Sequence, residues 1–305
     1  MKRIGMLTSG GDCQSLNATM RGVVKGLNVL EGTVEIYGFI DGYKGLIYGN
    51  YKRLTSKDFS GILTTGGTIL GTSRQPFKLM RTPDENGLDK VEAMKSTYRY
   101  LDLDCLVVLG GNGSQKTANL LREEGLNIVS LPKTIDNDIN GTEMTFGFQS
   151  AIDIATRTLE ELHTTAKSHK RIIIDEIMGN KAGFLTLYSG IAGEADIILI
   201  PEIPYSIDKI VDFINKKLDE GRRHIIIAAA EGIISKDESK LTKKELKQKR
   251  AAENYTSAAV YLEKKLSEKI NREIRAVVPG HIQRGGSPCA YDKVLTSRLG
   301  AKGAE

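Results

Sequence analysis

Two carboxylates stand two residues apart in the segment PKTIDND (132–138), which follows a short apolar run. A carboxylate in such a loop can serve as a general base, while the other orients it or lies near a metal ion. The lysine in the segment would keep the base ionised and could hold a transferring phosphoryl group. The alternative is an Asx-rich turn without chemistry.

Glycine-rich loops follow two other apolar runs. SGGDC (9–13) and GGNGS (110–114) each precede a helical pattern, so their backbone amides and a helix N-terminus can face an anion. Neither fits GxGxxG or GxxxxGK[ST], so the Rossmann and P-loop rules do not apply. One such loop is as consistent with a plain tight turn, but two together predict a phosphate or nucleotide site.

A second anion site is indicated near the end of the chain. GHIQRGGS (280–287) places a histidine and an arginine between glycines, shortly after Arg275, and such groups bind phosphate monoesters. GGTILGTSR (66–74), MGNKAG (178–183) and AEG (230–232) add further glycine and charged residues. A polyphosphate cradle, a phosphate pocket and a carboxylate pair together predict phosphoryl transfer to a hydroxyl of a phosphorylated acceptor.

Strand and helix patterns alternate along the chain. Apolar runs predict strands at 4–7, 105–109, 128–131, 172–174, 197–200 and 225–229, with a further strand to 278. Helical spacing predicts helices at 17–30, 114–124, 148–162, 207–218 and 290–302. The alternation predicts an α/β fold with a mostly parallel sheet covered by helices on both faces. Ligands then bind at the carboxyl ends of the strands, where the loops above lie.

Composition excludes several other classes of protein. The 305 residues carry 43 Lys and Arg against 38 Asp and Glu, and the run at 236–250 mixes both signs, which indicates a solvated helix rather than a nucleic-acid surface. No apolar run approaches the ~18–20 residues of a membrane span, and the N-terminus lacks a signal-peptide core. The three cysteines lie far apart in the sequence. We therefore expect a cytoplasmic protein that binds neither nucleic acid nor membrane.

These segments resemble 6-phosphofructokinase in family order and cover nearly the whole chain. The matching segments are SGGDC (9–13), NATMRG (17–22), GGTILGTSR (66–74), GGNGS (110–114), PKTIDNDI (132–139), SHKRI (168–172), MGNKAG (178–183), AEG (230–232) and GHIQRGGSP (280–288). The resemblance implies two similar lobes with the active site in the cleft between them. Residues 1–144 with 289–305 would bind the phosphoryl donor, and residues 145–288 would bind fructose 6-phosphate. Members of that family usually continue for several tens of residues beyond the position that matches Glu305.

The resemblance assigns a role to each matching position. Asp136 would be the base, supported by Asp138, while Thr134, Arg74 and Lys133 would stabilise the transferring phosphoryl group. The implied donor-binding residues are Gly11, Tyr43, Arg74, Gln75, Gly111, Asn112, Gly113 and Ser114. The implied fructose 6-phosphate residues are Thr134, Asp136, Arg171, Met178, Gly179, Asn180, Glu231, Arg275, His281 and Arg284.

The implied reaction moves the terminal phosphoryl group of ATP to the 1-hydroxyl of fructose 6-phosphate, a step of glycolysis, with Mg²⁺. The implied assembly is a homotetramer, a dimer of dimers, in which Arg171 and Arg275 reach across a subunit boundary. Several positions depart from the usual pattern: Gln14 and Ser15 replace a common Pro-Gly pair, and Asn180 stands where arginine is common, which argues against a direct substrate contact there. Two further departures concern the donor site. Asn112 stands where an aspartate usually holds Mg²⁺, which weakens the expected metal site, and Lys133 stands where ATP-dependent members usually have glycine.

Two alternatives to an ATP-dependent kinase stay open. Lys133 is typical of pyrophosphate-dependent relatives, whereas Gly113 leaves room for the α-phosphate of a nucleotide. We expect ATP as the donor, because a side chain that blocked position 113 would exclude a nucleotide, whereas a lysine near the transferring phosphate helps either donor. A non-catalytic sensor of sugar phosphates or nucleotides is the other alternative. Arg21 and Lys25 match two effector-binding positions of the family, but His163 and Glu220 fall where basic residues are usual, which argues against effector control.

Overall fold

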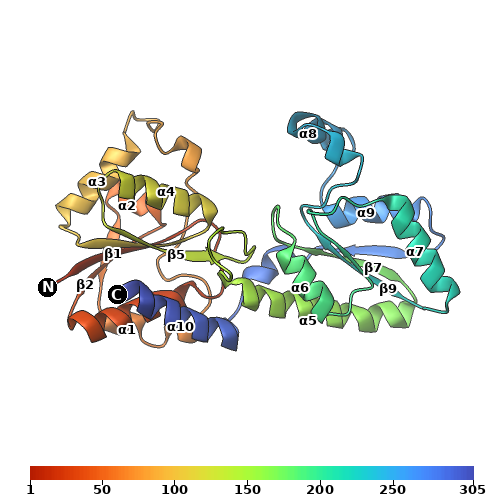
Figure 1. Cartoon of the computed structure of the whole chain (residues 1–305), viewed down its shortest axis with the longest axis horizontal. Helices are drawn as coiled ribbons and strands as arrows, with labels where there is room; N and C mark the ends of the chain where they lie inside the picture. The colour runs from red at the N-terminus through yellow and green to blue at the C-terminus, as the bar shows by residue number, and fades with distance from the viewer. The chain divides into compact units, whose positions relative to one another are not determined.

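The computed structural model describes all residues from 1 to 305, and the chain divides into two compact units. The first unit comprises residues 1–150 and 284–305, and the second comprises residues 151–283. Each unit has its own sheet flanked by helices (Figure 1). The predicted α/β fold with mostly parallel strands is confirmed. None of the helices is both long and apolar enough to cross a lipid bilayer.

The first unit contains a six-stranded sheet. Its strands are β1 (Arg3–Ser9), β2 (Glu35–Phe39), β3 (Tyr51–Leu54), β4 (Cys105–Gly110), β5 (Ile128–Thr134) and β6 (Phe146–Gly147). They lie in the order β3-β2-β1-β4-β5-β6, and all pairs are parallel except β2 with β3. The chain winds outward from β1 in one direction and from β4 in the other. The carboxyl ends of β1 and β4 therefore frame the point where such a sheet binds ligands.

Helices cover both faces of this sheet (Figure 1). They are α1 (Leu16–Glu31), α2 (Tyr43–Tyr48), α3 (Lys90–Tyr100), α4 (Asn112–Glu123) and α10 (Ala290–Ala304). On one face, α2, α3 and α4 pack on the strands in an apolar core. On the other, α1 and α10 lie side by side, and Gly300 permits their close approach because a Cβ there would lie 2.6 Å from the backbone nitrogen of Val23.

The second unit contains a four-stranded parallel sheet in the order β10-β7-β9-β8. Its strands are β7 (Ile172–Ile177), β8 (Ile197–Leu199), β9 (Ile225–Ala230) and β10 (Ile274–Val277). Its helices are α5 (Phe148–His169), which begins at the boundary, α6 (Phe184–Ala192), α7 (Ile207–Asp219), α8 (Lys243–Ala252) and α9 (Ala258–Ser267). The isoleucine-rich strands β7 and β9 pack against α7 and α9 in this unit's core.

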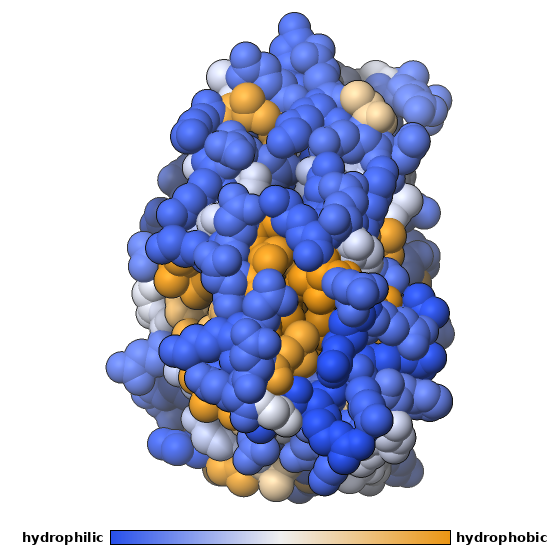
Figure 2. Space-filling model, turned by 90° about the vertical axis from the view of Figure 1, so that its right-hand side faces the viewer, coloured by the Kyte–Doolittle hydropathy of each residue, from blue (hydrophilic) through white to orange (hydrophobic).

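The mixed-charge run at 236–250 forms an exposed helix, as predicted, but the helix starts later. Helix α8 begins at Lys243, buries none of its residues, and projects away from the sheet of the second unit (Figure 1). Arg250 attaches this helix to the rest of the unit, since its Nε donates to Oε1 of the buried Glu238 at 3.0 Å. The face of the second unit shown in Figure 2 is mostly hydrophilic, with hydrophobic residues gathered near its middle.

All predicted strands and helices exist, with shifted bounds. Strand β5 continues to Thr134, so Lys133 lies within the strand rather than in a loop, and α5 continues to His169. Ser206 stands at the N-cap of α7, but its side chain makes no capping hydrogen bond. Five short 3₁₀ turns join the larger elements, at Ser56–Phe59, Ile62–Thr64, Phe77–Leu79, Glu238–Lys240 and Gly280–Arg284.

Candidate active site

The two glycine-rich loops meet at the carboxyl ends of β1 and β4. Ser9 and Gly110 are partners in the β1–β4 register, and Oγ of Ser114 donates to Oγ of Ser9 at 3.0 Å. A Cβ at Gly110 would lie 2.3 Å from Cβ of Ser114, and Gly10 has a φ of +88°, so both positions require glycine. The structure thus brings together the two loops from which the sequence predicts a phosphate site.

Tyr43 supports one of these loops from inside the core. Its side chain is fully buried, and its hydroxyl donates to the Ser114 carbonyl oxygen at 2.8 Å. Burial raises the pKa of this hydroxyl well above its ordinary value. Tyr43 has no exposed surface and positions the start of α4, so its expected contact with a nucleotide stays a prediction.

The segment before Arg74 is fastened to the loop after β1. The Gly10 nitrogen donates to the Ser73 carbonyl oxygen at 3.1 Å, and Oγ1 of Thr72 donates to the Gly10 carbonyl oxygen at 2.7 Å. Arg74 follows directly, exposed and without a hydrogen bond or ion pair in the chain, and Gln75 is half-buried. The geometry therefore holds the Arg74 backbone next to the glycine-rich loops and leaves its guanidinium available for an anion.

Lys133 lies beneath the same loops, near the end of β5. It is 3% exposed, and its Nζ lies 3.6 Å and 3.8 Å from where Cβ atoms would stand on Gly111 and Gly10. Burial lowers the pKa of this ammonium, whereas the charges of Asp136 and Asp12 act to raise it. A bound phosphate would add further negative charge and stabilise the protonated form.

The TIDND loop is closed by hydrogen bonds of its own. Oγ1 of Thr134 accepts from the Asp136 nitrogen at 3.1 Å, and Oγ1 of Thr145 donates to the Thr134 carbonyl oxygen at 2.8 Å. Asn137 adopts a left-handed φ of +51°, and its Oδ1 accepts from the Thr145 nitrogen at 2.9 Å. Asp136 and Asp138 are half-buried on this hydrogen-bonded turn. The loop follows β5, so it lies at the same edge of the sheet as the glycine-rich loops.

Arg284 lies in the first unit, although the expected boundary placed it with the substrate lobe. Its Nη1 donates to the Asp12 carbonyl oxygen at 2.9 Å and lies 3.1 Å from where a Cβ would stand on Gly11. Arg284 belongs to the first unit because the chain just after it packs there: the Gly286 carbonyl oxygen lies directly against Gly66. His281, three residues earlier, is exposed and belongs to the second unit.

In the second unit, Glu231 organises the loop after β7. Its Oε1 accepts from the backbone nitrogens of Gly179 at 3.1 Å and of Asn180 at 2.6 Å. Gly179 has a φ of +143°, and a Cβ there would lie 2.4 Å from the Ala182 carbonyl oxygen, so the turn requires glycine. Met178, Gly179, Asn180 and Glu231 are therefore brought together, as expected for parts of one pocket.

Arg171 and Arg275 are not brought to that pocket. Arg171 precedes β7 whereas Met178 follows it, and a six-residue strand separates the two by roughly 20 Å. Both arginines bind Glu273 instead, with N–O distances of 2.5 Å from Nε of Arg171 and from Nη2 of Arg275. Within one chain they form a separate cationic pair.

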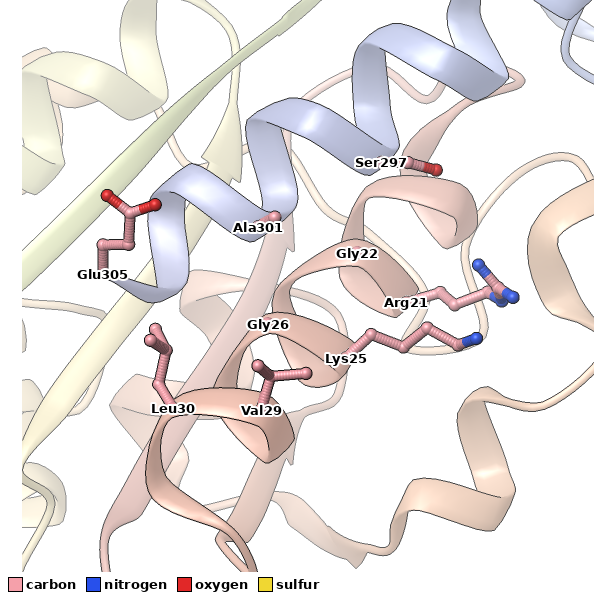
Figure 3. Close-up of a pocket in the computed structure, with 9 residues that line it drawn as sticks. All are labelled: Arg21, Gly22, Lys25, Gly26, Val29, Leu30, Ser297, Ala301 and Glu305. Carbon is pink, nitrogen blue, oxygen red and sulfur yellow. The ribbon is translucent and has the colours of Figure 1, made fainter.

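Arg21 and Lys25, the positions that match the family's effector site, line a hollow of about 310 Å³ between α1 and the end of α10. Their two cationic groups extend side by side at one end of the hollow, and Glu305 lies at the other (Figure 3). His163 belongs to the second unit. Its Nδ1 lies 3.2 Å from Nε2 of His224, and its Nε2 lies 3.0 Å from the Gly193 carbonyl oxygen. The absence of effector control stays a prediction.

No group of three or more His, Cys, Asp or Glu side chains could hold a metal ion. Mg²⁺ usually keeps several waters and binds one or two carboxylates together with substrate phosphates, so it needs no such cage. Asn112 is exposed at the first turn of α4 and offers a neutral amide oxygen. The Mg²⁺ site stays a prediction, with the Asn112 amide as its candidate ligand from this chain.

Some supporting residues escaped the sequence analysis. Gln283 is fully buried, although it was quoted only as part of an anion-binding segment. Cys13 is also fully buried beside Lys133, and burial raises the pKa of its thiol to about 12. Neither residue has a local pattern that would reveal its burial, because the burial depends on strands and loops far away in the sequence.

Comparison with known proteins finds several relatives of this chain. A protein described as ATP-dependent 6-phosphofructokinase from Spirochaeta thermophila is 49% identical over 311 residues, covering 100% of this chain and 84% of the relative. A pyrophosphate–fructose 6-phosphate 1-phosphotransferase from Amycolatopsis methanolica is 38% identical, covering 98% of this chain and 85% of the relative.

Among solved structures, a phosphofructokinase from Saccharomyces cerevisiae matches with a TM-score of 0.82 and 29% identity. The match covers 100% of this chain but only 41% of the yeast chain. The family model described as Phosphofructokinase matches residues 3–305. The chain therefore belongs to the phosphofructokinase family.

Proposed function

We propose that the protein transfers the terminal phosphoryl group of ATP to the 1-hydroxyl of fructose 6-phosphate, giving fructose 1,6-bisphosphate. One observation carries the proposal: two glycine-rich loops, a buried lysine and a loop with two carboxylates gather at one edge of the first unit's sheet. Glycine-rich backbone and a cation suit a polyphosphate, and a carboxylate base suits activation of a hydroxyl. Binding alone would not need the base.

The reaction follows from these groups. The oxygen of the 1-hydroxyl attacks the terminal phosphorus, its proton passes to the carboxylate of Asp136, and the bond from phosphorus to the bridging oxygen of the donor breaks. Lys133 and Arg74 offset the charge on the transferring group, and the Thr134 hydroxyl donates to it. Catalysis of this kind depends on positioning and charge stabilisation. Asp138 would orient the base from the same turn.

In this proposal the first unit binds the donor, with Gly11, Gly111 and Ser114 lining its site. The second unit binds fructose 6-phosphate through the loop that Glu231 organises and through His281. Mg²⁺ would accompany the donor phosphates, with Asn112 beside them, and would supply charge neutralisation. The weaker ligand at this position implies that the ion is held chiefly by the donor.

ATP is the favoured donor because Gly113 leaves open space. A Cβ at this position would meet no atom within 4 Å, so nothing in the chain crowds a nucleotide there. The relatives from Spirochaeta thermophila and Bacteroides thetaiotaomicron, 49% and 45% identical, are described as ATP-dependent. Pyrophosphate is the second candidate, supported by the buried cation of Lys133 and by the relative from Amycolatopsis methanolica.

We further propose a homotetramer, a dimer of dimers, in the cytoplasm. Arg171 and Arg275 lie at the opposite end of their strands from Met178, so they can serve such a pocket only in a neighbouring subunit. Helix α6 offers a surface for such contact: Phe184, Tyr188 and Ile191 are 44%, 50% and 66% exposed at helical spacing. The three free cysteines suit a reducing compartment.

The test is to incubate the protein with fructose 6-phosphate and millimolar Mg²⁺, with ATP in one arm and pyrophosphate in the other. Formation of fructose 1,6-bisphosphate is followed by an aldolase-coupled assay. We expect product in the ATP arm, at the higher rate. Product only in the pyrophosphate arm would identify pyrophosphate, not ATP, as the donor. Binding of fructose 6-phosphate without product in either arm would indicate a sensor.

A further inference from the structure

The 3₁₀ turn that carries His281 is attached to β7 by one buried side chain. Gln283 is fully buried; its Nε2 donates to the Glu176 carbonyl oxygen at 3.1 Å, and its Oε1 accepts from the Met178 nitrogen at 3.0 Å. Both partners lie more than one hundred residues away in the sequence. The amide therefore connects two segments that the proposed function assigns to fructose 6-phosphate.

These two hydrogen bonds replace the pairing with β10 at the end of β7, where β10 no longer lies beside it. The β10–β7 register ends at Asp175, while β7 continues beside β9 to Ile177. The Ile177 carbonyl oxygen accepts from the Glu231 nitrogen on the β9 side, so the alternate groups of Glu176 and Met178 face the edge that β10 leaves uncovered. The Gln283 amide offers one donor and one acceptor, as a peptide group of a continuing strand would.

The loop after β7 is thus held from two sides. Glu231 binds the Gly179 and Asn180 nitrogens, and Gln283 binds the Met178 nitrogen that begins the loop. Because Gln283 also lies two residues after His281, loss of its hydrogen bonds would release both segments at once. A buried donor and acceptor that lose their partners cannot bond to water instead, so these two hydrogen bonds hold the geometry strongly.

We propose that Gln283 is a positioning residue that sets the affinity for fructose 6-phosphate by joining the loop after β7 to the turn of His281. Its two hydrogen bonds go to Glu176 and Met178, both in the second unit. The proposal rests on the proposed function for the identity of the sugar phosphate. Its loss should raise KM for fructose 6-phosphate while kcat and KM for ATP stay nearly constant.

The experiment compares Gln283→Met, which keeps the length but removes both bonds, with Gln283→Glu. The carboxylate of Gln283→Glu can accept from Met178 but cannot donate to Glu176, whereas its protonated form can do both. We expect Gln283→Met to raise KM for fructose 6-phosphate at least tenfold at every pH, with kcat within about threefold of wild type. For Gln283→Glu, the ratio of its KM to that of wild type should fall as pH is lowered from 8 to 6.

Gln115→Met is the matched control, since Gln115 bridges backbone carbonyls of Gly110 and Leu131 in the first unit through its Nε2. It should leave KM for fructose 6-phosphate within twofold of wild type. If Gln283→Met lowers the melting temperature but leaves that KM within twofold, the positioning role is refuted. If Gln283→Met does not fold, the pH dependence of Gln283→Glu decides alone, and a flat ratio overturns the proposal. Wild-type protein that binds no fructose 6-phosphate in calorimetry would instead contradict the proposed function.

Discussion

At the scale of single residues, the donor preference depends on a side chain that is missing. Gly113 lies in the first turn of α4, exposed and with open space where a Cβ would be. We expect Gly113→Asp to lose at least tenfold in kcat/KM for ATP, about 1.4 kcal/mol, because a carboxylate there repels and crowds the α-phosphate. Steady-state kinetics with each donor measure this.

The same substitution should fold normally. An aspartate near a helix N-terminus is favourable, and a Cβ at position 113 meets no atom within 4 Å. An unchanged melting temperature with a reduced kcat/KM for ATP would show that the substitution affects the nucleotide and not folding. Unaltered ATP kinetics would show that the α-phosphate lies elsewhere and that Gly113 does not determine the donor.

The sequence predicted most of these residues but not how each is used. Asp136 and the glycines were recognisable because backbone approach and proton transfer demand particular residue types at short spacing. The burial of Tyr43 and the contact of Arg284 with the Asp12 loop were not predicted, because both depend on packing between distant segments. Tyr43 is enclosed by the core of the first unit, and Arg284 follows the chain back to the Asp12 loop. No local pattern encodes either contact.

At the scale of elements, β7 contains a charged residue where an apolar one is expected. Asp175 has no exposed surface, its strand neighbours are Ala228 and Val277, and neither of its carboxylate oxygens has a hydrogen-bond partner. Burial, with a smaller effect from the charge of Glu176, raises its pKa to about 8. The predicted strand stopped at residue 174 because sequence alone does not show that an aspartate will be buried.

This pKa predicts a pH-dependent stability. The unfolded chain loses the proton near pH 4, whereas the folded chain keeps it to about pH 8, so the folded state binds more protons between these values. Stability should therefore fall as pH rises from about 4 to 8. Asp175→Asn removes the ionisation, and we expect its melting temperature to exceed that of wild type at pH 8.5 by several degrees more than at pH 5. A pH-independent difference between the two proteins would refute the raised pKa.

At the scale of the whole molecule, the proposed assembly makes activity a property of neighbouring subunits. Arg171→Ala should raise KM for fructose 6-phosphate by about tenfold or more, since a charge-assisted contact contributes roughly 1.5–3 kcal/mol. Its matched partner is Asp136→Ser, which lacks the base. If one subunit supplies the base and its neighbour supplies the arginine, hybrids of the two variants contain some intact sites.

Subunits of both variants are dissociated, mixed and reassembled, and activity is measured at low fructose 6-phosphate concentration. We expect the mixture to exceed the average of its two parents severalfold. A mixture that never exceeds that average, or a monomer that is fully active at nanomolar concentration, would show that each chain forms its site alone.

The central claim is that the edge of the first unit's sheet performs phosphoryl transfer with Asp136 as its base. The most direct measurement is kcat of Asp136→Ser, with fructose 6-phosphate binding measured separately by calorimetry. A general base acts in the transition state, so we predict a loss of about 10²–10⁴-fold in kcat with a much smaller change in sugar-phosphate affinity. A kcat within threefold of wild type would contradict the account.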